Sequence, residues 1–179
     1  MVYEKDELIF ATEHLNIVPI TLQDQIELLK ILQDPNLMQL GWGKTFSLTE
    51  TRQWLEKIQQ QYHQFGYSYF FIIEKTTEEI VGLVGGLKTE IQGRPEVELA
   101  YIIKPFAQGH GYAHEAASGM LEFLHLKGVP SVIAQFVPDN KASKKVAEAL
   151  GLTYAGRYSR NLNGQLREHL IYRKELLPF

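Results

Sequence analysis

The chain has 179 residues, of which 45% are hydrophobic and 22% are charged, and it contains no cysteine. This composition predicts one globular domain over residues 1–179 and excludes long disorder, disulfide bonds and an acyl-cysteine intermediate. The formal net charge of −3 gives no basic surplus for binding nucleic acid or an anionic membrane. We expect a cytoplasmic protein, because no apolar run has the length of a signal peptide or a membrane span.

The chain is expected to begin with a strand and a helix. Residues 15–20 are typical of a short strand, and Thr21 can cap the helix that follows. The pair Asp34-Pro35 ends this helix, because proline disfavours helical backbone in the residue before it. Residues 34–46 are then expected to form a loop. The apolar face of the helix is expected to consist of Leu22, Ile26, Leu29 and Leu32.

A second helix and three strands follow. Ser47 has capping-box spacing to a glutamate, and Gly66 ends the helix that begins there. Aromatic and β-branched residues predict three strands, at 67–74, 80–88 and 96–103. Their short connections favour an antiparallel meander.

Helices and strands alternate in the second half of the chain. Helical spacing predicts an amphipathic helix over 111–127. Residues 131–137 predict a buried strand, which we expect to lie parallel to 96–103 because a helix connects the two. A helix over 139–151 and a hairpin with an Asn-Gly turn close the chain. The apolar face of that helix is expected to consist of Ala142, Val146, Ala149 and Leu150.

The most informative segment joins strand 96–103 to the next helix. Gly109 and Gly111 permit positive φ and let a ligand approach the backbone closely. The first amides of a helix lack internal partners and carry partial positive charge, which suits a phosphate or pyrophosphate. A glycine-rich turn that merely joins strand to helix explains the segment equally well. A Walker loop and a dinucleotide fingerprint are excluded, because no Gly-Lys-Ser/Thr follows and His114 stands at the place of the third glycine.

The order Gln108-x-x-Gly111-x-Ala113, before an apolar helix, resembles the acyl-CoA-binding motif of the GNAT superfamily of N-acetyltransferases, especially its RimJ/RimL-type branch. Four other segments resemble that branch in the same order: ATEHLNIVPIT from residue 11, ELAY from 98, PDNKAS from 138 and HLIY from 169. The resemblance covers nearly the whole chain. It implies a mixed α/β, GNAT-like acyl-CoA N-acyltransferase fold, with a central sheet of about seven strands flanked by helices. Two parallel strands would splay apart around the cofactor.

The resemblance also implies acetyl-CoA as the acyl donor, and no metal. The pantetheine arm would lie between the two parallel strands, with the pyrophosphate on the amides from Gly109 to Ala113. Asn140 and Ser143 would touch the pantetheine or the reacting centre, but Asn140 also suits a simple helix cap and Ser143 a solvated first helical turn. The implied cofactor-binding residues are Tyr101, Ile102, Ile103, Gln108, Gly109, His110, Gly111, Tyr112, Ala113, Asn140 and Ser143.

Two residues are candidates for the chemistry. Glu98 is either a general base for the attacking amine or a carboxylate that is paired or solvated on the sheet face. Many superfamily members use a tyrosine as the acid for the leaving thiolate, but the matching position is Ala147. Ser143, or a water that it holds, is the hypothesis in its place. Glu98 and Trp42 are the candidates for binding the acceptor, and a loop anchor is the other interpretation of Trp42.

The expected activity is transfer of an acetyl group from acetyl-CoA to a primary amine, by direct attack in a ternary complex. The acceptor is a protein N-terminal α-amine or a small-molecule amine, and the acidic residues Glu90, Glu96 and Glu98 favour a cationic one. The alternative is a non-catalytic acyl-CoA-binding sensor or interaction module. A homodimer is compatible with the sequence. His110 and His114 have a metal-binding spacing, but no third ligand is evident.

Overall fold

The computed structural model describes residues 3–176. Its strands are β1 (Phe10–Ala11), β2 (Leu15–Pro19), β3 (Tyr69–Glu74), β4 (Ile80–Ile91), β5 (Arg94–Ile103), β6 (Ser131–Phe136), β7 (Thr153–Leu162) and β8 (Gln165–Glu175). Its helices are α1 (Gln25–Leu32), α2 (Pro35–Met38), α3 (Leu48–Phe65), α4 (Tyr112–Leu126) and α5 (Lys141–Ala149), with 3-10 turns at Leu22–Asp24 and Pro105–Ala107. No helix within residues 3–176 has the length and apolarity needed to cross a membrane.

Within the described residues, eight strands form one sheet in the order β1-β2-β3-β4-β5-β6-β8-β7. β5 and β6 are parallel, and every other neighbouring pair is antiparallel. The predicted mixed α/β class, meander and parallel pair are therefore confirmed. The sheet has eight strands instead of about seven because Phe10 and Ala11 pair with β2 at its edge. A strand of two residues is too short to show an alternating pattern in the sequence.

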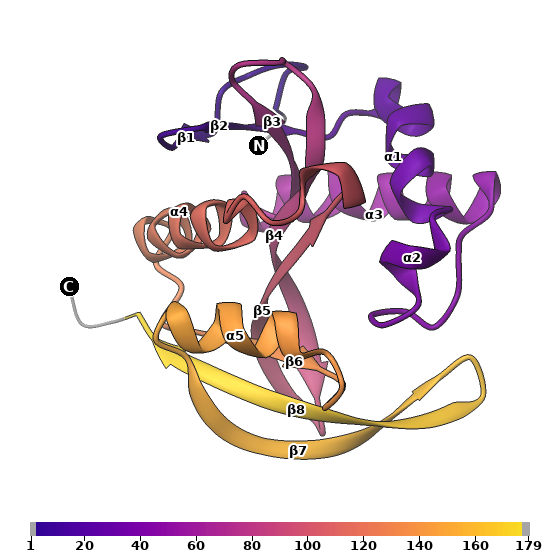
Figure 1. Cartoon of the computed structure of the whole chain (residues 1–179), viewed down its shortest axis with the longest axis vertical. Coiled ribbons are helices and arrows are strands. Elements are labelled where there is room, and N and C mark those ends of the chain that lie inside the picture. Colours follow the sequence, from indigo (N-terminus) through magenta and orange to yellow (C-terminus); the bar gives the residue numbers. More distant parts are fainter. Residues whose placement is uncertain (1–2, 177–179) are drawn as a thin grey trace.

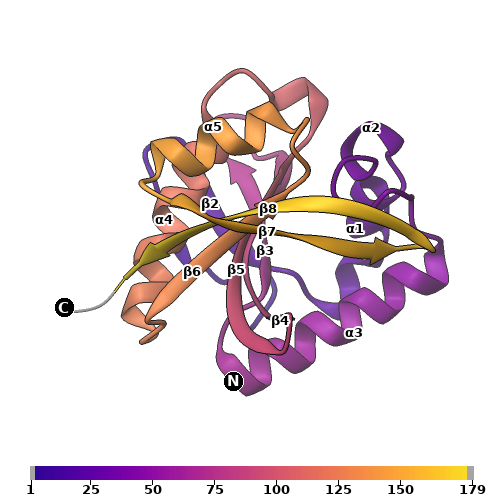
Figure 2. The ribbon, with the colours of Figure 1, turned by 90° about the horizontal axis from the view of Figure 1, so that it is seen from below.

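Helices cover both faces of the sheet. α4 and α5 lie on one face, and α3 lies on the opposite face with α1 packed against it (Figure 1, Figure 2). α4 approaches β4 closely because Gly86 has no side chain: a Cβ there would lie 2.6 Å from a methyl carbon of Leu124. Tyr62 and Phe70 are among the fully buried side chains of the core. Burying one large apolar side chain stabilises the fold by about 1.5–3 kcal/mol, so these layers hold the strands firmly.

The predicted apolar face of the first helix is correct at its end, where Leu32 is buried and Leu29 is half-buried, and wrong at its start. Leu22 and Ile26 are 64% and 58% exposed, and the buried side chains are Leu28, Ile31 and Leu32. The segment begins as a 3-10 turn, capped by Thr21 as predicted, before α1 starts. A 3-10 turn has three residues per turn, so its side chains do not continue the face of the α-helix that follows.

The predicted loop over 34–46 contains the short helix α2. Asp34 caps it by accepting a hydrogen bond from the Asn36 amide at 2.9 Å, and Pro35 occupies its first turn. Proline is favoured at the first helical position, where its missing N–H is not needed. The Asp-Pro pair therefore ends one helix and begins the next.

The predicted apolar face of α5 is only partly buried. Ala147 and Leu150 are buried against the core, whereas Ala142 and Ala149 are exposed and Val146 is half-buried. The residues at 142, 146 and 149 form a separate stripe along the helix, because they are spaced by four and three positions. That stripe faces the cavity described next, so its apolar character does not serve the core.

Candidate functional site

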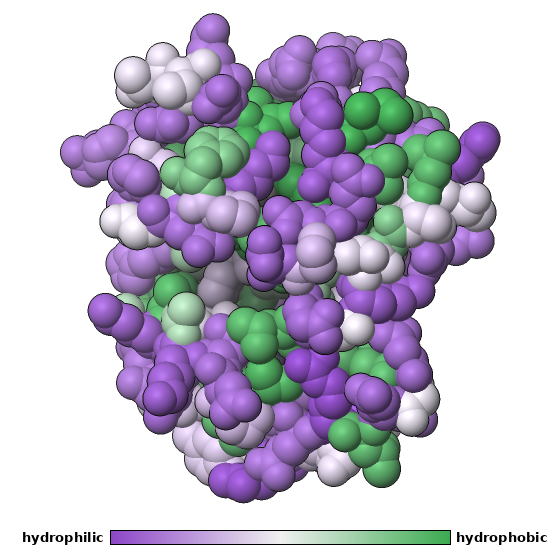
Figure 3. Space-filling model, turned by 45° about the vertical axis from the view of Figure 1, so that its right-hand side comes forward, coloured by the Kyte–Doolittle hydropathy of each residue, from purple (hydrophilic) through white to green (hydrophobic). Residues whose placement is uncertain are grey.

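A cavity of about 850 Å³ opens where β5 and β6 diverge. Among the described residues the two strands share one register pair, Glu98 opposite Ile133, whereas β5 pairs with β4 along its whole length. The residues beyond that pair, 99–103 of β5 and 134–136 of β6, line the cavity. On the side where α2 and the tip of the β7–β8 hairpin lie, the surface is hollowed near its middle (Figure 3). The parallel strands thus splay apart as predicted.

The turn between β5 and α4 presents a row of unpaired amides. Gly109 and Gly111 have φ of 82° and 77°, and Gly111 is the N-cap of the 15-residue helix α4. Within residues 3–176, the amides of 109–114 donate to no other group of the chain. A Cβ at either glycine would meet nothing within 4 Å. Open space, free amides and the helix dipole give this wall the chemistry of an anion site.

Side chains hold this turn in place. Gln108 donates through Nε2 to the Ile103 carbonyl at 2.9 Å, and Nδ1 of His110 lies 3.1 Å from a backbone carbonyl of the turn. The Tyr112 hydroxyl donates to Glu74 at 3.0 Å, which ties the start of α4 to β3. The turn is therefore formed before any ligand arrives, which lowers the entropic cost of binding.

The start of α5 forms a second wall. Asn140 Oδ1 accepts from the Ser143 amide at 3.1 Å, so Asn140 is a helix cap, and it also lines the cavity. The Tyr101 hydroxyl donates to the Ser143 carbonyl at 3.0 Å and links β5 to α5. Burial, opposed by this hydrogen bond, raises the pKa of Tyr101 to about 12. The Ser143 hydroxyl lines the same cavity and has no hydrogen-bond partner among the described residues.

Glu98 lies at the point where the strands part. Gln135 donates through Nε2 to Glu98 Oε2 at 2.9 Å, and Glu98 makes no ion pair with the described residues. Burial raises the pKa of Glu98, and both this hydrogen bond and the nearby Arg160 oppose the rise. The carboxylate therefore takes up a proton more readily than an exposed one, as a general base requires.

Gln135 joins Glu98 to two further groups. Its amide oxygen accepts from the Tyr158 hydroxyl and lies 3.2 Å from Nδ1 of His169. Because a carboxylate only accepts, the amide nitrogen faces Glu98 and the oxygen faces His169, so Nδ1 carries the proton. Nε2 of His169 is then unprotonated, and it is buried without a hydrogen-bond partner among the described residues. Burial and two nearby arginines lower the pKa of His169 to about 4, which keeps the ring neutral.

A third wall is apolar and aromatic. We call it the aromatic wall, and it consists of Leu37, Leu40, Trp42 and Tyr69. Trp42 packs edge-on against Trp54 with ring centroids 5.3 Å apart, so it anchors its loop as well as lining the cavity. The Arg160 guanidinium lies 5.6 Å from the centroid of the Trp42 ring. A cation therefore sits beside apolar surface at this wall.

The loop that carries Trp42 is tied to the β7–β8 hairpin. Asn163 Nδ2 donates to the Trp42 carbonyl at 3.0 Å, and Arg167 donates to the Gln39 and Leu40 carbonyls at 3.2 and 3.1 Å. We call these three hydrogen bonds the hairpin bridge. The two segments also approach each other in both ribbon views (Figure 1, Figure 2). The bridge thus connects two cavity-lining parts of the chain that are far apart in the sequence.

Nearly all of the predicted site residues meet at this cavity. The candidates for catalysis, for cofactor binding and for acceptor binding that the structure describes line the cavity, with the exception of His110. Ala147, at the position of the family's tyrosine, is buried and lies outside the lining. Of the acidic residues expected to attract a cation, Glu96 forms a bidentate ion pair with Arg173 at 2.5 and 3.1 Å. Glu98 is the member of that group that lines the cavity.

Sequence reasoning does not identify the polar residues grouped around Glu98, namely Gln135, Tyr158, Arg160 and His169. Gln135 had a signal, because it is a polar residue near the end of a strand predicted to be buried. Arg160 had none, since charged residues are common on exposed hairpins. Among residues 3–176, no cluster of three or more histidine, aspartate and glutamate side chains is placed to hold a metal ion.

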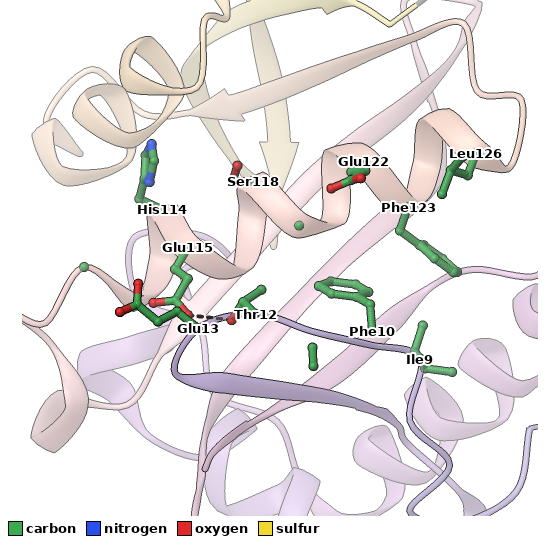
Figure 4. A pocket seen from close by; sticks show the side chains of 13 residues that line it. Ile9, Phe10, Thr12, Glu13, His114, Glu115, Ser118, Glu122, Phe123 and Leu126 are labelled. Atoms are coloured by element: carbon green, nitrogen blue, oxygen red, sulfur yellow. Dashed lines mark hydrogen bonds between the residues drawn. The ribbon is translucent and has the colours of Figure 1, made fainter. Parts of the chain in front are cut away.

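A second hollow lies between α4 and the edge strand β1 (Figure 4). Its Glu115 accepts hydrogen bonds from the Thr12 hydroxyl at 2.5 Å and the His14 amide at 2.7 Å. Phe10 and Phe123 from the two elements line another part of it. Glu115 therefore fastens the start of the sheet to α4, and we place the functional site in the cavity between β5 and β6.

Similarity to known proteins indicates the family of the chain. The model of the acetyltransferase (GNAT) domain family matches residues 14–153, a span that contains the amide turn, Glu98 and Asn140. The chain is 30% identical over 135 residues to the uncharacterized protein YkkB of Bacillus subtilis (strain 168). These residues make up 74% of this chain and 78% of YkkB.

Two solved structures are similar in fold. A GNAT-family acetyltransferase from Bacillus anthracis has a TM-score of 0.78 at 21% identity, over 93% of this chain and 97% of its own. RimL, a ribosomal L7/L12 α-N-protein acetyltransferase in complex with coenzyme A, has a TM-score of 0.77 at 19% identity. The similarity covers 94% of this chain and 98% of the RimL chain. At these identities the likeness concerns the fold.

Proposed function

The chain belongs to the GNAT acetyltransferase family, and from this premise we propose that it transfers an acetyl group from acetyl-CoA to a primary amine. The family prediction made from the sequence is confirmed, and it favours an enzyme over a non-catalytic acyl-CoA-binding module. One observation carries the proposal. A single cavity has unpaired amides on one wall and a half-buried carboxyl, Glu98, where the strands part.

Acetyl-CoA is the donor that suits this cavity. The amides of 109–114 and the dipole of α4 would bind its pyrophosphate. The edge of β5 from Tyr101 to Ile103 would pair with the amides of the pantetheine arm, as an added strand does. The apolar stripe of α5 would cover the arm. RimL, a protein of similar fold, was solved in complex with coenzyme A, which supports coenzyme A as the kind of ligand that this chain binds.

We propose direct transfer in a ternary complex, because the chain has no cysteine to carry the acetyl group. The amine nitrogen attacks the thioester carbonyl carbon, the new C–N bond forms, and the C–S bond breaks. The amine gives its proton to Glu98, directly or through water. A backbone amide near Ile102 would stabilise the oxyanion.

Coenzyme A leaves as a thiolate and takes up a proton. Ser143 is our candidate donor, directly or through a water, because its hydroxyl lines the cavity without a partner among the described residues. A Ser143→Ala variant with unchanged turnover would remove this role.

The donor is tested by thermal unfolding with acetyl-CoA, coenzyme A, ATP and NAD in parallel. A ligand that binds only the folded state stabilises it, by about 2.7 kcal/mol at a concentration of 100 Kd. We expect acetyl-CoA and coenzyme A to raise the melting temperature and ATP and NAD to leave it unchanged. No rise at saturating acetyl-CoA would overturn the proposal.

A further inference from the structure

Arg160 differs from the other arginines of the β7–β8 hairpin. Each of the others is bound to a carboxylate or to backbone carbonyls, namely Arg157, Arg167 and Arg173. The Arg160 guanidinium donates no hydrogen bond and forms no ion pair within residues 3–176, and it lies over Trp42 at the cavity. A half-buried guanidinium keeps unused donors in a fixed fork, which is the geometry that binds a carboxylate through two parallel hydrogen bonds.

Arg160 and Glu98 line the same cavity and do not pair with each other. The positive charge of Arg160 also counteracts part of the effect that burial has on the pKa of Glu98. The neutral His169 beside them adds no charge. The cavity therefore has a positive group, Arg160, and a carboxyl group, Glu98, that do not neutralise each other. This pair is complementary to a molecule that carries both an anionic group and an amine.

The surroundings indicate what else this molecule contains. The aromatic wall borders Arg160 through Trp42, and it offers apolar surface and few polar groups. An acceptor with an apolar or aromatic side chain would bury that side chain against this wall. The burial would stabilise the complex by about 25 cal/mol for each Å² of apolar surface removed from water.

The hairpin bridge lies between two segments that line the cavity. It fastens the loop with Trp42 to the hairpin with Arg160 by three hydrogen bonds. A protein N-terminus continues into a chain that must leave the cavity past these walls. A free amino acid ends at its own carboxylate, which could bind Arg160 inside the cavity.

We propose that the acceptor is a free α-amino acid with an apolar or aromatic side chain, whose carboxylate binds Arg160 and whose amine meets Glu98. This inference rests on the proposed acetyl transfer and names its substrate class. The products are the N-acetyl amino acid and coenzyme A, and the proton lost by the amine passes to Glu98. Arg160 takes no part in the bond changes and determines specificity.

The test uses the full chain and three matched sets of acceptors. Phenylalanine, leucine and methionine are each compared with their carboxamide and with the corresponding amine that lacks the carboxylate. We expect kcat/KM for the best amino acid to exceed that for its carboxamide by about 10- to 100-fold, the range of a charge-assisted hydrogen-bond pair. Arg160→Gln should abolish this preference, so that kcat/KM for the amino acid falls to about the value for its carboxamide in the same variant.

Two controls keep the result interpretable. Arg157→Gln removes an exposed arginine of the same strand, which lies outside the cavity, and should keep the wild-type preference. Arg160→Lys keeps the charge without the fork and should give an intermediate preference. Stabilisation by acetyl-CoA is measured for every variant, to show that each one folds and binds the donor.

The failures of the two proposals are distinguishable. Equal kcat/KM for amino acids and carboxamides, or faster acetylation of a short peptide than of every free amino acid, overturns the inference and leaves the acetyltransferase proposal standing. A preference that persists in Arg160→Gln also overturns it. A wild-type chain that neither binds acetyl-CoA nor acetylates any of these amines overturns both.

Discussion

Glu98 reduces the stability of the fold that holds it. Burial raises its pKa above the ordinary value, against the hydrogen bond from Gln135 and the charge of Arg160. Between the ordinary and the raised pKa, the folded chain therefore holds more protons than the unfolded chain. The free energy of unfolding falls as pH rises through that window, and the full cost is present above the raised pKa. A group that is unfavourable for stability at neutral pH is a candidate for function.

Replacing Glu98 by glutamine separates the two effects. The Glu98→Gln variant should lose about 10²- to 10⁴-fold in turnover, the usual contribution of a general base. Its melting temperature at pH 7.5 should equal or exceed that of the wild type, because the ionised carboxylate is gone and the Gln135 amide still finds an acceptor. Glu96→Gln is the matched control, because it breaks the ion pair with Arg173 and should lower the melting temperature with little effect on turnover. Retained turnover in Glu98→Gln would contradict the role of a base.

His169 gives the opposite dependence on pH. Its pKa is lowered to about 4, first by burial and then by Arg160 and Arg167. The unfolded chain binds this proton at a higher pH than the folded chain does, so the contribution of His169 to stability is complete above the ordinary pKa. It is lost as pH falls from about 6.5 towards 4.

Denaturation with urea at pH 7, 6 and 5 tests this prediction. The free energy of unfolding of the wild type should fall with pH more steeply than that of His169→Gln, whose side chain does not titrate. Comparing the slopes of the two proteins removes the shared contribution of Glu98, which acts in the opposite direction. Parallel curves would show that His169 is not held neutral by the fold.

At the scale of elements, the glycine turn before α4 combines backbone strain with binding. Gly111 has φ of 77°, and a side chain there is strained by about 1 kcal/mol. Gly128, after α4, has φ of 81° and equally open space around it. The two glycines are therefore matched in conformation and differ in their distance from the amide row.

Alanine at each glycine separates strain from binding. Both Gly111→Ala and Gly128→Ala should lose about 1 kcal/mol in the free energy of unfolding. Gly111→Ala should also weaken acetyl-CoA binding, measured by calorimetry, because its Cβ occupies the space beside the anion site. Gly128→Ala should bind acetyl-CoA as the wild type does. Equal affinity in both variants would remove the amide row from the binding site.

Elements with strong local signals could be predicted, and those without them could not. The meander, α4 and the cap at Asn140 follow from β-branched runs, helical spacing and capping residues. β1 is too short for a pattern, and Pro35 indicates the end of a helix in the sequence although it also starts α2. The stripe of α5 shows a deeper limit, since Ala142 and Ala149 are apolar because they line a cavity. Hydrophobicity in a sequence does not distinguish the core from a ligand site.

At the scale of the whole molecule, the order of the strands assembles the site. Gln135 is on β6, His169 on β8 and Tyr158 on β7, and these strands are neighbours in the order β6-β8-β7. β8 lies between two strands that precede it in the chain. The hydrogen-bond network of Glu98 therefore depends on register and on a non-sequential strand order, which spacing along the sequence does not contain. The amide turn is local, and it could be predicted.

The hairpin bridge connects the N-terminal part of the molecule with its C-terminal hairpin beside the splayed strands. Arg167 supplies two of the three hydrogen bonds, to the carbonyls of Gln39 and Leu40. Arg167→Gln should therefore loosen the hairpin, and the amides of 161–166 should exchange with deuterium faster than in the wild type. If the bridge limits the acceptor, the same variant should acetylate short peptides several-fold faster relative to free amino acids.

Acetyl-CoA affinity should remain unchanged in Arg167→Gln, because the amide turn lies on another wall of the cavity. Arg94→Gln, an exposed change at the β4–β5 turn, is the control for removing a positive charge. Faster exchange without a change in acceptor preference would show that the bridge stabilises the hairpin and does not select the acceptor. The exclusion of protein N-termini would then have to come from the aromatic wall, which Trp42→Ala would open.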